Sequence, residues 1–116
     1  MDWVFYKIRN DYTLTHQKGN IKIWVNLALD WVTVTLSEAS GGSDQRVFSY
    51  GKFFLAKDLE SSKKFIETMI QEMPDGCLEE CGIYVTNKLK DYGDDISEEG
   101  TEDFSWRIFL LDRGLH

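Results

Sequence analysis

The sequence predicts an α+β fold, with a mainly antiparallel sheet of about four strands and two helices packed on one face of that sheet. Over most of residues 1–56, apolar and polar side chains alternate, which is the period of a strand with one face against a core. From Lys57 onward, the apolar spacing changes to the three- and four-residue intervals of a helix. A chain of 116 residues suits a single globular domain over 1–116.

Residues 21–36 predict the central strand of the sheet. Every second side chain is apolar up to Trp31, and after Trp31 the phase shifts by one, so that Val32 begins a second apolar set. Because a one-residue shift sends each later side chain to the opposite face, we expect a β-bulge or a sharp bend at Asp30–Trp31. Trp31 and Val32 would then point to the same side of the sheet.

The N-terminal segment predicts a first strand at Asp2–Arg9, with apolar side chains on both sides. Asn10–Asn20 is polar and ends in a turn signal at Gln17–Asn20. Tyr12 and Leu14 leave open a second interpretation of this segment, in which it extends the first strand and the two form a hairpin.

Two further strands complete the predicted sheet. Ser37–Asp44 contains adjacent glycines and predicts a turn, after which Gln45–Ala56 returns as a strand. Phe104–Leu111 closes the sheet, with apolar residues on both of its faces. Consecutive strands joined by turns favour an antiparallel meander.

A first helix is predicted after Asp58, which can cap its N-terminus, and it ends before Pro74. A meander needs a helix to cover one of its faces, so we interpret the apolar stripe of this helix as core. The stripe consists of Leu59, Phe65, Ile66, Met69, Ile70 and Met73.

Cys77–Tyr92 fits two patterns. Gly82 and the run Ile83–Thr86 favour a strand, whereas the spacing of the apolar residues favours a helix, which we prefer. On a helix, Cys77 and Cys81 lie on one face. The chain has two histidines and no second cysteine pair, so we expect reduced, buried thiols without a metal. The helical stripe is Leu78, Cys81, Val85, Leu89 and Tyr92.

The net charge of −7 is distributed unevenly along the chain. Residues 1–57 carry seven Lys/Arg and five Asp/Glu, a balance of +2, and residues 58–116 carry six and fifteen, a balance of −9. An excess of acid argues against binding to nucleic acid phosphates or to an anionic membrane. It suits a basic partner.

The acids are densest at Asp91–Asp103, where seven of thirteen residues are acidic and none is basic. An EF-hand calcium loop is disfavoured, because Gly93 stands at ligand position 3 and Ile96 replaces the obligatory glycine at position 6. We therefore expect no metal ion here. Two interpretations remain: a solvated acidic loop, and a loop that contacts a partner.

The sequence argues against an enzyme. His16 and His116 lie in no catalytic motif, and no phosphate-binding glycine loop or Cys/His ligand set is present. We expect no catalytic residue and no cofactor. The chain also lacks a signal-peptide pattern and an apolar run of about 20 residues, so we expect a cytoplasmic protein that does not enter a membrane.

These observations favour a protein that binds and neutralises a basic protein partner. Acidic side chains gathered on one surface attract a cationic protein and raise its association rate. The sequence leaves the oligomeric state undetermined. The predicted partner-binding residues are Asp91, Asp94, Asp95, Glu98, Glu99, Glu102, Asp103, Glu79 and Glu80.

In size, charge and expected location, the chain resembles bacterial immunity proteins of contact-dependent or polymorphic toxin systems. The resemblance implies a single-domain inhibitor that blocks a cognate toxin, such as a nuclease, and performs no chemistry itself. It concerns overall layout, so no toxin-contact residue is transferred from the family. The alternatives are a nucleic-acid mimic, which would need acids spaced along an elongated face, and a small acidic subunit of a larger assembly.

Overall fold

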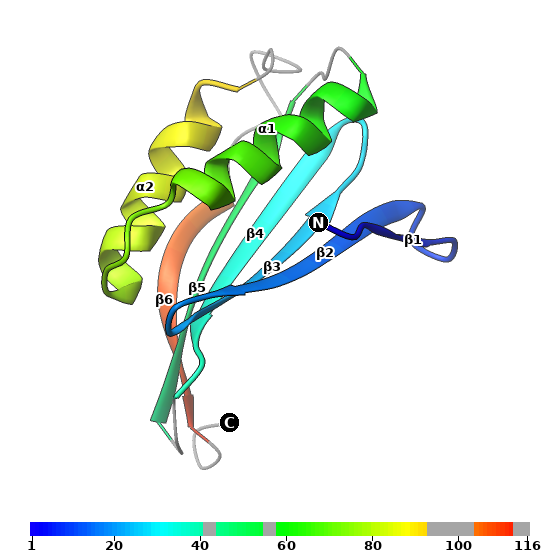
Figure 1. Cartoon of the computed structure of the whole chain (residues 1–116). Coiled ribbons are helices and arrows are strands. Elements are labelled where there is room, and N and C mark those ends of the chain that lie inside the picture. The colour runs from blue at the N-terminus through cyan, green and yellow to red at the C-terminus, as the bar shows by residue number, and fades with distance from the viewer. Residues whose placement is uncertain (41–43, 55–57, 93–103, 113–116) are drawn as a thin grey trace.

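The computed structural model describes residues 1–40, 44–54, 58–92 and 104–112. The strands are β1 (Val4–Tyr6), β2 (Asp11–Lys18), β3 (Ile21–Leu27), β4 (Trp31–Glu38), β5 (Asp44–Phe53) and β6 (Phe104–Asp112). The helices are α1 (Leu59–Glu72) and α2 (Leu78–Lys90). The strands form one antiparallel sheet in sequence order, and both helices lie on one face of it (Figure 1). The predicted α+β class is confirmed, with six strands in place of about four.

Residues 21–36 form two strands joined by a turn. β3 and β4 pair antiparallel, and across the turn the Ala28 N–H donates to the Trp31 carbonyl oxygen at 2.9 Å. The predicted bulge is therefore wrong, whereas the alternative of a sharp bend is correct, because the chain bends at Leu29–Asp30 and reverses. The reversal returns the second apolar set to the same core. Val32 is 1% exposed, whereas Trp31 is half-buried on the other face. The turn contains no glycine or proline that would have signalled it.

The polar segment after β1 is itself a strand. The predicted first strand, Asp2–Arg9, is regular only over β1, and the chain turns back at Asn10, whose φ of 59° is one that asparagine tolerates. β2 then pairs with β1 on one side and with β3 on the other, so the hairpin interpretation is correct. The turn predicted at Gln17–Asn20 lies at Gly19–Asn20, where Gly19 has a φ of 60°.

The core lies between the sheet and the two helices. Alternate side chains of β2 to β5 face the helices, and the predicted stripes of α1 and α2 pack against them. Both helix predictions are confirmed. The buried apolar residues of the sheet layer are Leu14, Ile21, Ile23, Val25, Leu27, Val32, Val34, Leu36, Phe48, Tyr50 and Phe54.

The boundaries of α1 follow the local signals in the sequence. The Ser61 N–H donates to Asp58 Oδ1 at 2.7 Å, so Asp58 is the predicted N-cap. At the other end, Met73 has extended backbone angles (φ −61°, ψ 135°), as expected for the residue before Pro74.

Two lysines of the sheet bind the C-terminal ends of the two helices. The last carbonyl groups of a helix lack partners within it and form the negative end of its dipole. Lys52 Nζ, from β5, lies 3.0, 2.6 and 3.1 Å from the carbonyl oxygens of Leu89, Lys90 and Tyr92. Lys18 Nζ, from β2, lies 3.2, 2.6 and 2.6 Å from those of Ile70, Gln71 and Met73. Each ammonium group thus holds a helix end against the sheet.

Gly82 lets α2 approach β5 closely. A Cβ atom at this position would lie 2.6 Å from Cδ2 and 2.7 Å from Cζ of Phe48, whose ring is fully buried. Gly82 favours a strand when read from the sequence, yet it lies inside α2 because the packing leaves no room for a side chain.

Candidate functional site

The predicted acidic contact surface lies only partly within the described residues. Glu79 and Glu80 occupy the first turn of α2, and Asp91 follows its last turn, where it is exposed. The remaining predicted contact residues lie outside the described residues: Asp94, Asp95, Glu98, Glu99, Glu102 and Asp103.

The two glutamates of α2 make contacts within the chain. Glu79 forms an ion pair with Arg46 of β5. The carboxylate of Glu79 accepts hydrogen bonds from its own backbone N–H and from the Arg46 side chain, and these bonds hold the pKa of Glu79 below its ordinary value. Glu80 Oε1 accepts a hydrogen bond from the Cys77 N–H at 3.1 Å. Both carboxylates lie at the positive end of the helix dipole, so they also stabilise the start of α2.

Excess acid is a property of the helical layer. Residues 58–92, which contain both helices, carry eight Asp/Glu and four Lys/Arg, a balance of −4. Residues 1–54, which contain β1 to β5, carry five Asp/Glu and six Lys/Arg, a balance of +1. The charge imbalance along the sequence is therefore also an imbalance between the two layers of the fold.

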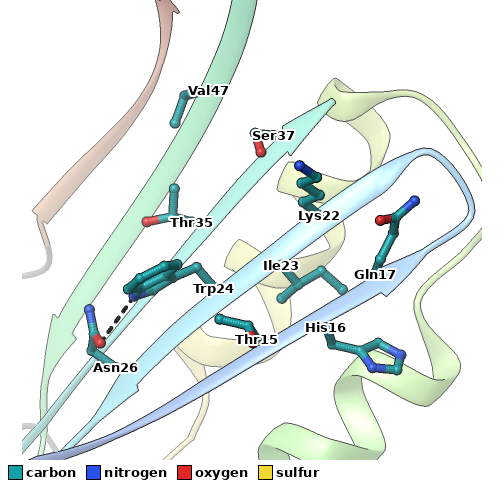
Figure 2. Close-up of a pocket in the computed structure, with 10 residues that line it drawn as sticks. All are labelled: Thr15, His16, Gln17, Lys22, Ile23, Trp24, Asn26, Thr35, Ser37 and Val47. Atoms are coloured by element: carbon teal, nitrogen blue, oxygen red, sulfur yellow. Dashed lines mark hydrogen bonds between the residues drawn. The ribbon is translucent and has the colours of Figure 1, made fainter. Parts of the chain in front are cut away.

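The face of the sheet opposite the helices carries a groove with a volume of about 650 Å³ (Figure 2). Strand register aligns the residues of this face in cross-strand rows. Over β2 to β5, Lys22 is the one charged residue of these rows and no carboxylate occurs, and on β6 Arg107 pairs with Ser49 at the end of the second row. The first row is Thr13, Asn26, Thr33 and Gly51. The second is Thr15, Trp24, Thr35 and Ser49, and the third is Gln17, Lys22, Ser37 and Val47.

Trp24 stands at the centre of this groove with 47% of its surface exposed. Its Nε1–H donates to Asn26 Oδ1 at 3.1 Å, the bond drawn in Figure 2. Asn26 is fixed in turn, because the Thr13 hydroxyl donates to Oδ1 at 3.0 Å and Nδ2 donates to the Thr33 hydroxyl at 3.4 Å. These hydrogen bonds restrain the orientation of the indole ring.

An ion pair between exposed Arg9 and buried Asp11 anchors the end of this hydrogen-bonded chain. Arg9 Nη2 donates to Thr13 Oγ1 at 3.1 Å, and Arg9 Nε donates to Asp11 Oδ2 at 3.0 Å. Asp11 is fully buried. Sequence reasoning missed the groove, although a tryptophan in the polar phase of an alternating strand, between Lys22 and Asn26, was a usable signal.

Among the described residues, the two thiols and His16 do not form a cluster. In the ranges that the structure describes, no group of three or more His, Cys, Asp or Glu residues could hold a metal ion. Cys77 and Cys81 are both free thiols. The predicted burial of Cys77 is wrong, because α2 begins at Leu78 and Cys77 precedes it as an exposed N-cap residue. Cys81 is buried, and desolvation raises the pKa of its thiol. His16 is exposed on β2, in register with Ile23.

No helix within the described ranges is both long and apolar enough to cross a membrane. Comparisons of the chain with protein-family models, with curated proteins and with solved structures gave no match.

Proposed function

We propose that the protein binds a basic protein partner and neutralises it, as an immunity protein does for its cognate toxin. The observation that supports this proposal is the separation of charge between the layers. The helical layer has a balance of −4, and six further acids follow in residues 93–103, whereas β1 to β5 and their turns have a balance of +1. A surface of one sign steers an oppositely charged protein and orients it on approach.

Several acids of the helical layer already have structural partners. Asp58 and Glu80 bond to backbone N–H groups at the two helix starts, and Glu60 and Glu79 pair with lysine or arginine. Asp91 is exposed at the end of α2 and leads directly into the densest acidic stretch. The proposed contact therefore centres on Asp91–Asp103, whereas Glu79 and Glu80 lie at the opposite end of α2. Repulsion among these acids would be relieved when a cationic partner binds.

Association kinetics test this proposal. A toxin gene with a variable C-terminal domain beside the gene for this chain would supply the partner for this test. The variant replaces Asp94, Asp95, Glu98 and Glu99 by Asn or Gln. The parent should associate quickly and more slowly as salt is added, because surface charges are screened. The variant should lose about tenfold or more in association rate and lose inhibition of the toxin, with a melting temperature unchanged or slightly raised.

A charge-matched control removes four acids from the first half of the chain: Asp2, Asp30, Glu38 and Asp44. It changes the net charge by the same amount, so it should keep most of the association rate if position matters. Equal rates and equal inhibition for the parent and the acidic-stretch variant would contradict the proposal.

A further inference from the structure

The groove on the open face has a chemistry different from that of the acidic helical layer. Thr15 and Thr35 are the cross-strand neighbours of Trp24, and Gln17 and Ser37 are those of Lys22. Neighbouring residues across a sheet have Cβ atoms about 5 Å apart, so the Thr15 and Thr35 hydroxyl groups flank the indole ring, and Gln17 and Ser37 lie in the next row beside Lys22. Each of them can both donate and accept a hydrogen bond.

Trp24 offers a rigid apolar surface in the middle of these polar groups. Exposed aromatic surface is unfavourable in water, and a ring held by Asn26 loses little conformational freedom when a ligand covers it. Tryptophan is also well suited to sites where one side is apolar and the surroundings are wet. The arrangement in Figure 2, with Thr15 and Thr35 beside Trp24, therefore suits a ligand that is polar around its edge and apolar on one flat face.

We propose that this groove binds a neutral oligosaccharide, with one sugar ring stacked on Trp24. A pyranose ring presents C–H groups on one face and hydroxyl groups around its rim. The C–H face would cover the indole, and the hydroxyls would bond to Thr15, Thr35, Gln17 and Ser37, with Lys22 as an additional donor. The volume of about 650 Å³ lies within the range of small-ligand sites.

Charge excludes the competing ligand classes. A cationic ligand would find no carboxylate in the rows of the groove and would meet the Lys22 ammonium. A nucleotide could stack on Trp24, but its phosphates would have to bind a chain with a net charge of −7, which disfavours them. The site lies on the sheet layer and is independent of the toxin-binding proposal.

Titration of the ¹⁵N-labelled chain with maltotriose, cellotriose and chitotriose tests this site by NMR. At least one trisaccharide should shift the Trp24 indole N–H, the Asn26 side-chain amide and the backbone amides of Thr15 and Thr35 in a saturable way. Because an open face covers one side of a ligand, we expect a Kd on the order of 1 mM. Trp24→Ala should weaken binding about tenfold or more, and since the side chain is exposed, the variant should fold.

Trp3→Phe is the matched control. Trp3 Nε1–H donates to Glu67 of α1 at 2.8 Å, so this tryptophan lies away from the groove, and its replacement should leave the Kd unchanged within about twofold. Adenosine monophosphate and a thymidine oligonucleotide serve as competing probes. The proposal is overturned if no trisaccharide shifts the groove residues, or if a nucleotide probe binds there more tightly.

Discussion

Replacement of Lys52 by methionine tests the interaction that holds the end of α2. Lys52 is 2% exposed, and its ammonium group donates to three carbonyl oxygens at the end of that helix. Methionine preserves much of the apolar stem but removes all three donors. The bond to the Leu89 carbonyl oxygen is buried, so that acceptor would lose its partner where water does not easily replace it.

The expected loss follows from two effects. An orphaned buried acceptor costs about 1–3 kcal/mol, and the lost attraction between a cation and a helix C-terminus adds about 1 kcal/mol. We therefore expect the free energy of unfolding to fall by about 3 kcal/mol. With an unfolding entropy of about 2.1 cal/mol/K per residue over 116 residues, the melting temperature should fall by about 12 °C.

Urea denaturation and thermal melts followed by circular dichroism measure this effect. Lys64→Met is the control, because Lys64 is exposed on α1 and its replacement should change the free energy of unfolding by about 0.5 kcal/mol or less. If Lys52→Met loses no more stability than Lys64→Met, the ammonium group does not stabilise the helix end. The cost of burying its charge would then cancel its hydrogen bonds.

Three further predictions concern α2 and its contacts. Gly82→Ala should lower the free energy of unfolding by about 1–3 kcal/mol in urea denaturation, because its methyl group would collide with the ring of Phe48. Stability equal to or higher than that of the parent would show that the core can adjust. In the native protein, Ellman's reagent should react quickly with Cys77 and slowly with Cys81, because the Cys81 thiol is buried and has a raised pKa. Equal reaction rates of the two thiols would contradict this prediction. Arg46→Gln should raise the pKa of Glu79 toward the ordinary 4.5 in an NMR titration. Because the pKa of Glu79 is lowered in the folded state, the stabilisation from its carboxylate is present above about pH 4.5 and is lost as the pH falls through the lowered pKa. An unchanged titration midpoint of Glu79 in Arg46→Gln would mean that Arg46 does not lower this pKa.

The sequence alone determined those features that depend on neighbours along the chain. Asp58 and Pro74 predicted the limits of α1, because capping and proline geometry act within one turn of helix. The turn at Gly19–Asn20 and the stripe that made Cys77–Tyr92 a helix are local in the same way. The α+β class followed from these periods, since a sheet with one apolar face needs a cover.

Only the tertiary structure decided the features that join distant parts of the chain. The phase shift at Trp31 fits a bulge or a hairpin equally well from the sequence, and the pairing of β3 with β4 decides between them. Lys18 and Lys52 are separated from the helix ends they bind by tens of residues, so no local pattern marks them. The groove around Trp24 exists because register aligns mostly uncharged polar residues from neighbouring strands, and register is a property of the paired strands together.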